Sequence, residues 1–118
     1  MARKQCIGYK VVIVKQQKFM SVVYDDDVAS VEYKLNTKSR PRPNNGPLCV
    51  FSDMANAKFF FDCDMISGRG NILKVRYKPS YENRVWTTVV NRKYSVPILY
   101  LPRGTVLADT VTPFEVIE

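Results

Sequence analysis

The residues best suited to chemistry in this chain are cations at alternate positions. Lys74, Arg76 and Lys78 alternate with apolar residues. If this segment is a strand, the three cations share one face and lie about 6–7 Å apart along it. Such a row is suited to contacting successive phosphates. The alternative is that the cations only solvate an outer strand face and prevent aggregation.

The positive charge of the chain is concentrated in one segment. The net charge is +7 over 118 residues; residues 65–104 carry +7, residues 1–64 carry +3 and residues 105–118 carry −3. This excess favours an anionic partner, either a nucleic acid or an acidic protein. The candidate binding residues therefore also include Arg84, Arg92 and Lys93. The candidates for stacking on bases are Tyr81, Trp86 and Tyr94, although Trp86 also suits a core position.

The longest predicted loop, residues 36–47, is also basic. It contains three prolines and the cations Lys38, Arg40 and Arg42. Cations separated by prolines form a stiff, extended arm suited to phosphate contact, so Arg40 and Arg42 join the candidate binding residues. Basic surface loops also occur without any such role.

Several chemistries are excluded or disfavoured by the composition. The chain has no histidine, which removes Ser-His-Asp and Cys-His catalysis and histidine-ligated metal sites. No glycine-rich loop matches a nucleotide-binding fingerprint. The run 25–27 is acidic but lacks the spacing of a calcium loop, so an acidic turn is expected. We expect no catalytic residues, no metal and no cofactor.

A strand followed by a helix is predicted to organise the fold. Residues 48–51 are apolar and follow a Gly-Pro turn, which is typical of a buried strand. Ser52 is the expected N-cap of a helix over about residues 53–63, whose alanines and phenylalanines supply a surface to pack on a sheet. We predict a single α+β domain over residues 1–118. A strongly bent antiparallel or mixed sheet of six to eight strands would pack on this one main helix.

The other strands follow from β-branched and alternating segments. They are expected at residues 7–14, 19–24, 30–35, 72–78, 85–90 and 94–101, with one or two short strands at 105–109 and 114–117. Residues 15–18 predict a hairpin turn between the first two. Pro97 indicates an edge strand or a bulge.

The remaining features indicate a cytoplasmic protein. No apolar run approaches the 18–20 residues of a membrane-spanning helix, and the first apolar segment is broken by Lys10 and is interpreted as a strand rather than a signal peptide. Cys6, Cys49 and Cys63 are odd in number and widely spaced, so reduced, buried thiols are expected.

Two segments carry a resemblance. Residues 47–51 with Ala57 and Phe60, and residues 101–113, resemble small accessory proteins of phages and bacterial mobile elements, over about a quarter of the chain. This resemblance implies a small accessory protein that binds a host component, such as a nuclease, a defence complex or a nucleotide signal. Together with the cations it leads to our first hypothesis, a non-enzymatic protein that binds an anionic host partner. The first strands are also similar to ADP-ribosyltransferase-like folds, although the required glutamate motif has no counterpart. A nucleotide-handling protein and a structural particle component are therefore the alternatives.

Overall fold

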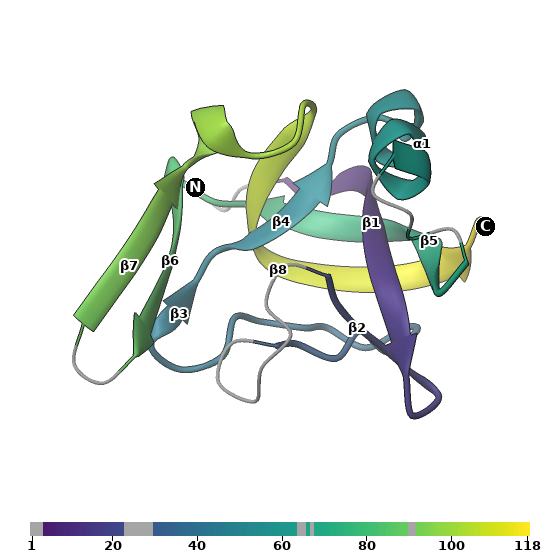
Figure 1. The fold of residues 1–118 in the computed structure, drawn as a ribbon, viewed down its shortest axis with the longest axis horizontal. Helices are drawn as coiled ribbons and strands as arrows, with labels where there is room; N and C mark the ends of the chain where they lie inside the picture. The colour runs from purple at the N-terminus through teal and green to yellow at the C-terminus, as the bar shows by residue number, and fades with distance from the viewer. Residues whose placement is uncertain (1–3, 23–29, 64–65, 67, 90–91) are drawn as a thin grey trace.

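The computed structural model describes residues 4–22, 30–63, 66, 68–89 and 92–118 (Figure 1). Within them, eight strands and one main helix confirm the predicted α+β class. The elements are β1 (Cys6–Lys15), β2 (Lys18–Ser21), β3 (Asn45–Gly46), β4 (Leu48–Phe51), α1 (Met54–Cys63), β5 (Gly70–Pro79), β6 (Arg84–Val89), β7 (Arg92–Pro97), the 3₁₀ turn η1 (Ile98–Tyr100) and β8 (Thr105–Val116). The predicted acidic turn at 25–27 lies outside the described residues.

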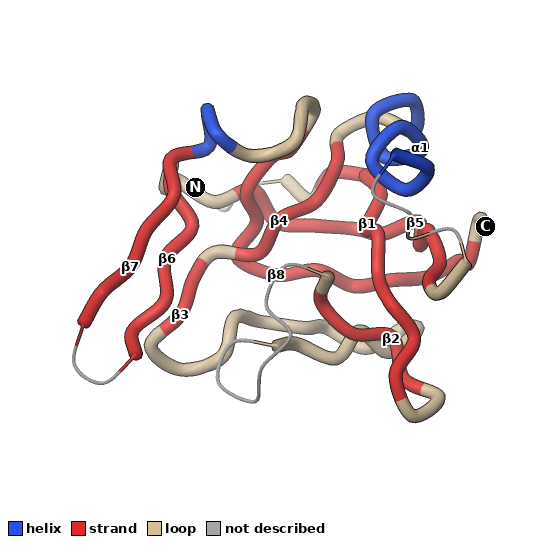
Figure 2. Tube along the Cα trace, in the orientation of Figure 1, coloured by secondary structure: helices blue, strands red, loops and turns tan. Residues whose placement is uncertain are grey.

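The larger sheet bends until it closes. Its strand order is β2-β1-β4-β8-β5, and β5 pairs again with β1, so four antiparallel strands form a small barrel (Figures 1 and 2). The β1–β2 hairpin turns at Gln16 and Gln17, both of which have positive φ. The predicted strongly bent sheet is therefore confirmed. The bend brings the first strand beside β5, which is distant in the sequence.

Alternation along the strands divides the core into two parts. Leu73, Val75 and Tyr77 point into the barrel and are buried there, as their spacing predicts. The opposite faces of β1 and β5 carry Val11 and Ile72, which are buried against α1. Apolar side chains on both faces thus hold β1 and β5 in the middle of the molecule.

The helix begins differently from the prediction. Asp53, not Ser52, caps it: the Asp53 carboxylate accepts from the backbone N–H of Asn56 at 2.8 Å and from the Asn56 side chain at 2.8 Å. Ser52 instead donates to the carbonyl of Gly104, at 3.5 Å, and so connects the start of the helix to the turn before β8. Phe61 is buried against the barrel, whereas Phe59 is 68% exposed.

The cap predicts a pH dependence of stability. The hydrogen bonds from Asn56 hold the pKa of the Asp53 carboxyl below its ordinary value. The stabilisation that the ionised Asp53 cap gives the folded protein is therefore complete above about pH 4. It is lost as the pH falls through the lowered pKa of Asp53. Asp53→Asn keeps an acceptor but does not titrate, so its thermal midpoint should fall less steeply below pH 4 than that of the wild type. Equal slopes in the two proteins would contradict this coupling.

Further sequence predictions were wrong. The strand expected at 94–101 ends at Pro97 and is followed by the 3₁₀ turn η1. Residues 30–35 form only an isolated bridge, between Glu32 and Met20, rather than a strand. The tail forms one continuous strand, β8, because a bulge at Phe114 lets the pairing with β5 continue past Pro113. The three thiols, expected to be buried, are not: Cys63 is exposed, and Cys6 and Cys49 are half-buried.

A second sheet projects from the barrel. It consists of β3, β6 and β7, with β7 at its edge (Figure 2). In the β6–β7 register, the backbone N–H groups of Lys93 and Ser95 point away from β6, toward the open edge of the sheet. Pro97 occupies the next such position and has no N–H. The prediction of an edge strand from Pro97 is confirmed. No helix of the described residues is long and apolar enough to cross a membrane.

Candidate nucleic-acid interface

The predicted row of cations on β5 lies on the outside of the barrel. Arg76 and Lys78 are exposed and Lys74 is half-buried, whereas the residues between them are buried. On one side β5 pairs with β1, and on the other with β8, where Arg76 lies opposite Thr112 and Lys78 opposite Thr110. The cations therefore project from the middle of a continuous sheet rather than from an edge.

The basic loop extends this surface. The backbone N–H of Ser39 donates to the carbonyl of Val111 at 2.7 Å, and the N–H of Val111 donates back at 3.0 Å. Both side chains are buried. This antiparallel register places the exposed Lys38 and Arg40 on the outer side of the sheet, beside Thr112 and Thr110 respectively.

Two rows of cations thus cross β8. Arg76 lies opposite Thr112 and Lys78 opposite Thr110. Extending the single Ser39–Val111 bridge by one residue on each side aligns Lys38 with Thr112 and Arg40 with Thr110. The cations are about 6–7 Å apart along the strands and about 10 Å apart across β8. We call Lys38, Arg40, Arg76 and Lys78 the basic face. Figure 1 shows the loop passing along β8 on the side opposite β5.

The ion pairs that form between described residues do not involve the basic face. They join Lys58 to Asp62, at 3.5 Å, and to Glu118. The guanidinium of Arg76 lies 4.3 Å from the centre of the Phe114 ring, which holds it in place without reducing its charge. Positive charge is therefore available to an anionic partner.

The other predicted residues lie elsewhere. Lys74 is on the same strand face, but its cross-strand neighbour is Glu115, so its charge is partly offset. Arg42 donates to the carbonyl of Ser30 at 3.4 Å and lines a cavity instead. The exposed cations Arg84, Arg92 and Lys93 belong to the projecting β6–β7 hairpin. The structure therefore groups Lys38, Arg40, Arg76 and Lys78 in one face and places the other predicted cations outside it.

The stacking candidates also lie on or beside the projecting hairpin. Trp86 is half-buried: its indole N–H donates to Glu82 at 3.2 Å, and Lys93 lies 4.7 Å from the centre of its ring. The Trp86 ring also packs against Gly46 on β3. Tyr81 is 81% exposed and Tyr94 is 54% exposed. The two tyrosines are thus the more accessible rings.

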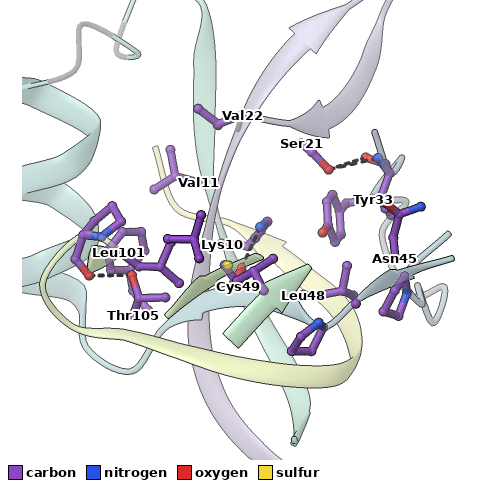
Figure 3. Close-up of a pocket in the computed structure, with 18 of the residues that line it drawn as sticks. Lys10, Val11, Ser21, Val22, Tyr33, Asn45, Leu48, Cys49, Leu101 and Thr105 are labelled. Carbon is purple, nitrogen blue, oxygen red and sulfur yellow. Dashed lines mark hydrogen bonds between the residues drawn. The ribbon is translucent and has the colours of Figure 1, made fainter. Parts of the chain in front are cut away.

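A cavity lies at the seam of the barrel. Among the described residues, β1 and β4 pair only at Tyr9 and Phe51. Beyond this pair the two strands separate and leave a space of about 110 Å³, which we call the seam cavity (Figure 3). Lys10 reaches across it and donates to the carbonyl of Cys49 at 2.6 Å. Burial raises the pKa of the Cys49 thiol, and the Lys10 ammonium offsets part of this shift.

Sequence reasoning missed two features of these sites. It did not connect the loop with β5, because the Ser39–Val111 bridge joins segments that are distant in the chain. It noted Lys10 only as an interruption of an apolar segment, and that interruption was the available signal for the cavity. Comparison of the chain with protein-family models, with curated proteins and with solved structures found no match.

Proposed function

We propose that this protein is a non-enzymatic accessory protein that binds the phosphate backbone of a nucleic acid through its basic face. The observation that carries the proposal is the register that aligns two cations of the loop with two of β5 across the uncharged residues Thr110 and Thr112. Guanidinium and ammonium groups in such an array suit the regularly spaced charges of a phosphate backbone.

The geometry favours contact with the backbone over recognition of a sequence. The basic face presents lysine and arginine donors, and the half-buried Thr112 lies between its cations; all three residue types are common donors to phosphate oxygens. Neither a helix nor a two-stranded ribbon of the described residues carries the four cations of the basic face, so this face has no element suited to enter a major groove. Binding should therefore depend on charge and salt rather than on base sequence.

The test is a salt titration with a fluorescently labelled single-stranded oligonucleotide. If the four cations each displace one counterion, log K should fall with log salt concentration with a slope of about −3. Oligonucleotides of unrelated sequence should bind with the same affinity, and a duplex should give a slightly steeper slope. Fluorescence anisotropy provides the measurement.

Polyglutamate of matched charge is the control ligand. If polyglutamate binds and the oligonucleotide does not, the partner of the basic face is an acidic protein and the proposal is wrong. An oligonucleotide affinity that does not change with salt would also contradict it, since binding in a small pocket responds weakly to salt.

A further inference from the structure

Lys10 occupies an unusual position for a charged residue. In the β1–β5 register it lies directly opposite Leu73, which is fully buried inside the barrel. Directly opposite residues of an antiparallel pair point to the same side, so Lys10 faces inward, between the buried Gly8 and Val12. Lys10 is half-buried, so its stem lies among apolar side chains while its ammonium group bonds to the protein.

The Lys10 ammonium group contacts a carbonyl and an aromatic ring. Its ammonium group has three N–H donors. Among the described residues, the carbonyl of Cys49 is the acceptor it reaches, at 2.6 Å, and the centre of the Tyr33 ring lies 5.1 Å from Nζ. One of the three donors is thus used by Cys49, and Lys10 itself lines the seam cavity.

The walls of the seam cavity select for an apolar body with negative charge. Its lining includes the apolar side chains Leu48, Val85 and Trp86 beside Lys10. Arg42 adds a second cation to the lining, and no described residue of the lining is acidic. A cavity with a predominantly apolar wall and one or two convergent polar groups is typical of small-molecule sites.

We propose that the seam cavity binds a small organic anion, with an apolar body against Leu48 and Val85 and a carboxylate that accepts from Lys10. The cavity of about 110 Å³ is smaller than the 150 Å³ space that holds benzene in another protein, so only a body of about ring size enters. This site is separate from the basic face, and the proposal does not depend on nucleic-acid binding.

Benzoate is the probe, and benzyl alcohol is its neutral counterpart. Trp86 is the only tryptophan of the chain and lines the cavity, so its fluorescence reports occupancy. We expect benzoate to bind the wild type about tenfold more tightly than benzyl alcohol, since a charge-assisted hydrogen bond forms only with the anion. Isothermal titration calorimetry gives an independent affinity.

Lys10→Met removes the charge and keeps an unbranched apolar chain of similar length. In this variant benzoate should bind at least tenfold more weakly, whereas benzyl alcohol should bind as before. Lys34→Met, at an exposed position, is the matched control and should leave both affinities unchanged. Equal affinities of benzoate for the wild type and Lys10→Met would overturn the proposal, as would failure of benzoate to bind the wild type.

A second measurement uses the wild type alone, in case Lys10→Met does not fold. Cys49 lines the cavity, whereas Cys63 is exposed at the end of α1. Benzoate should slow the reaction of Cys49 with a thiol reagent and leave that of Cys63 unchanged, as mass spectrometry of the labelled peptides would show. Unchanged labelling of Cys49 at saturating benzoate would contradict the proposed site.

Discussion

Reversing the charges of Arg76 and Lys78 together should weaken oligonucleotide binding by at least about 25-fold at 0.1 M salt. The estimate follows from losing two phosphate contacts, each with a salt exponent of about 0.7 for single strands. Both side chains are exposed and form no ion pair with a described residue, so Arg76→Glu with Lys78→Glu should leave the fold intact. The slope of log K against log salt should fall in magnitude from about 3 to about 1.4.

The matched control changes the same net charge at the other end of the barrel. Lys18 begins β2 beside the hairpin turn, and Arg69 precedes β5; both are exposed and lie far along the strands from Lys78. Lys18→Glu with Arg69→Glu should retain most of the affinity. If both double variants lose affinity equally, the protein binds through its net charge alone and the basic face is not a site.

The loop row gives an independent check of the geometry. Lys38→Glu with Arg40→Glu should reduce the affinity and the salt slope as much as the β5 variant does, because the two rows flank the same strand. An unchanged affinity in the loop variant, combined with a loss in the β5 variant, would limit the site to β5. The bridge between Ser39 and Val111 would then have only a structural role.

Strand alternation predicted the orientation of the β5 cations because, past Ile72, one face of that strand is buried and the other carries half-buried or exposed cations. The buried set of Leu73, Val75 and Tyr77 fixes the register, and a shift by one residue would expose all three. The same rule could not locate Lys10. On β1 both faces are apolar, since α1 covers the outer one, so the pattern does not say which face points into the barrel.

Tertiary contacts decided the remaining differences. Ser52 and Asp53 are both good N-cap residues, and the cap falls on Asp53 while Ser52 bonds to Gly104. A sequence pattern cannot rank two such neighbours when a distant turn makes the choice. Similarly, the sequence of the proline-rich loop revealed its positive charge but not its position beside β8, because that position depends on backbone hydrogen bonds to Val111.

Closure of the barrel leads to the second large effect, which is on stability. Gly70 lies opposite Ile13 where β5 meets β1. A Cβ at Gly70 would lie 2.1 Å from the carbonyl oxygen of Val12 and 2.7 Å from Ile66 Cγ2. The first of these contacts is with backbone, which cannot turn away as a flexible side chain can. Gly70→Ala should therefore lower the free energy of unfolding by about 3 kcal/mol, the upper part of the range for overpacking.

Gly68 provides a control two residues away. A Cβ added there would meet nothing within 4 Å, so Gly68→Ala should change the free energy of unfolding by no more than about 0.5 kcal/mol. Urea denaturation of both variants and the wild type makes the comparison. If Gly70→Ala is as stable as Gly68→Ala, β1 and β5 do not approach as closely as the closed barrel requires. The basic face would then lack the rigid sheet that aligns its two rows, because β5 is held in place by β1 on one side and β8 on the other.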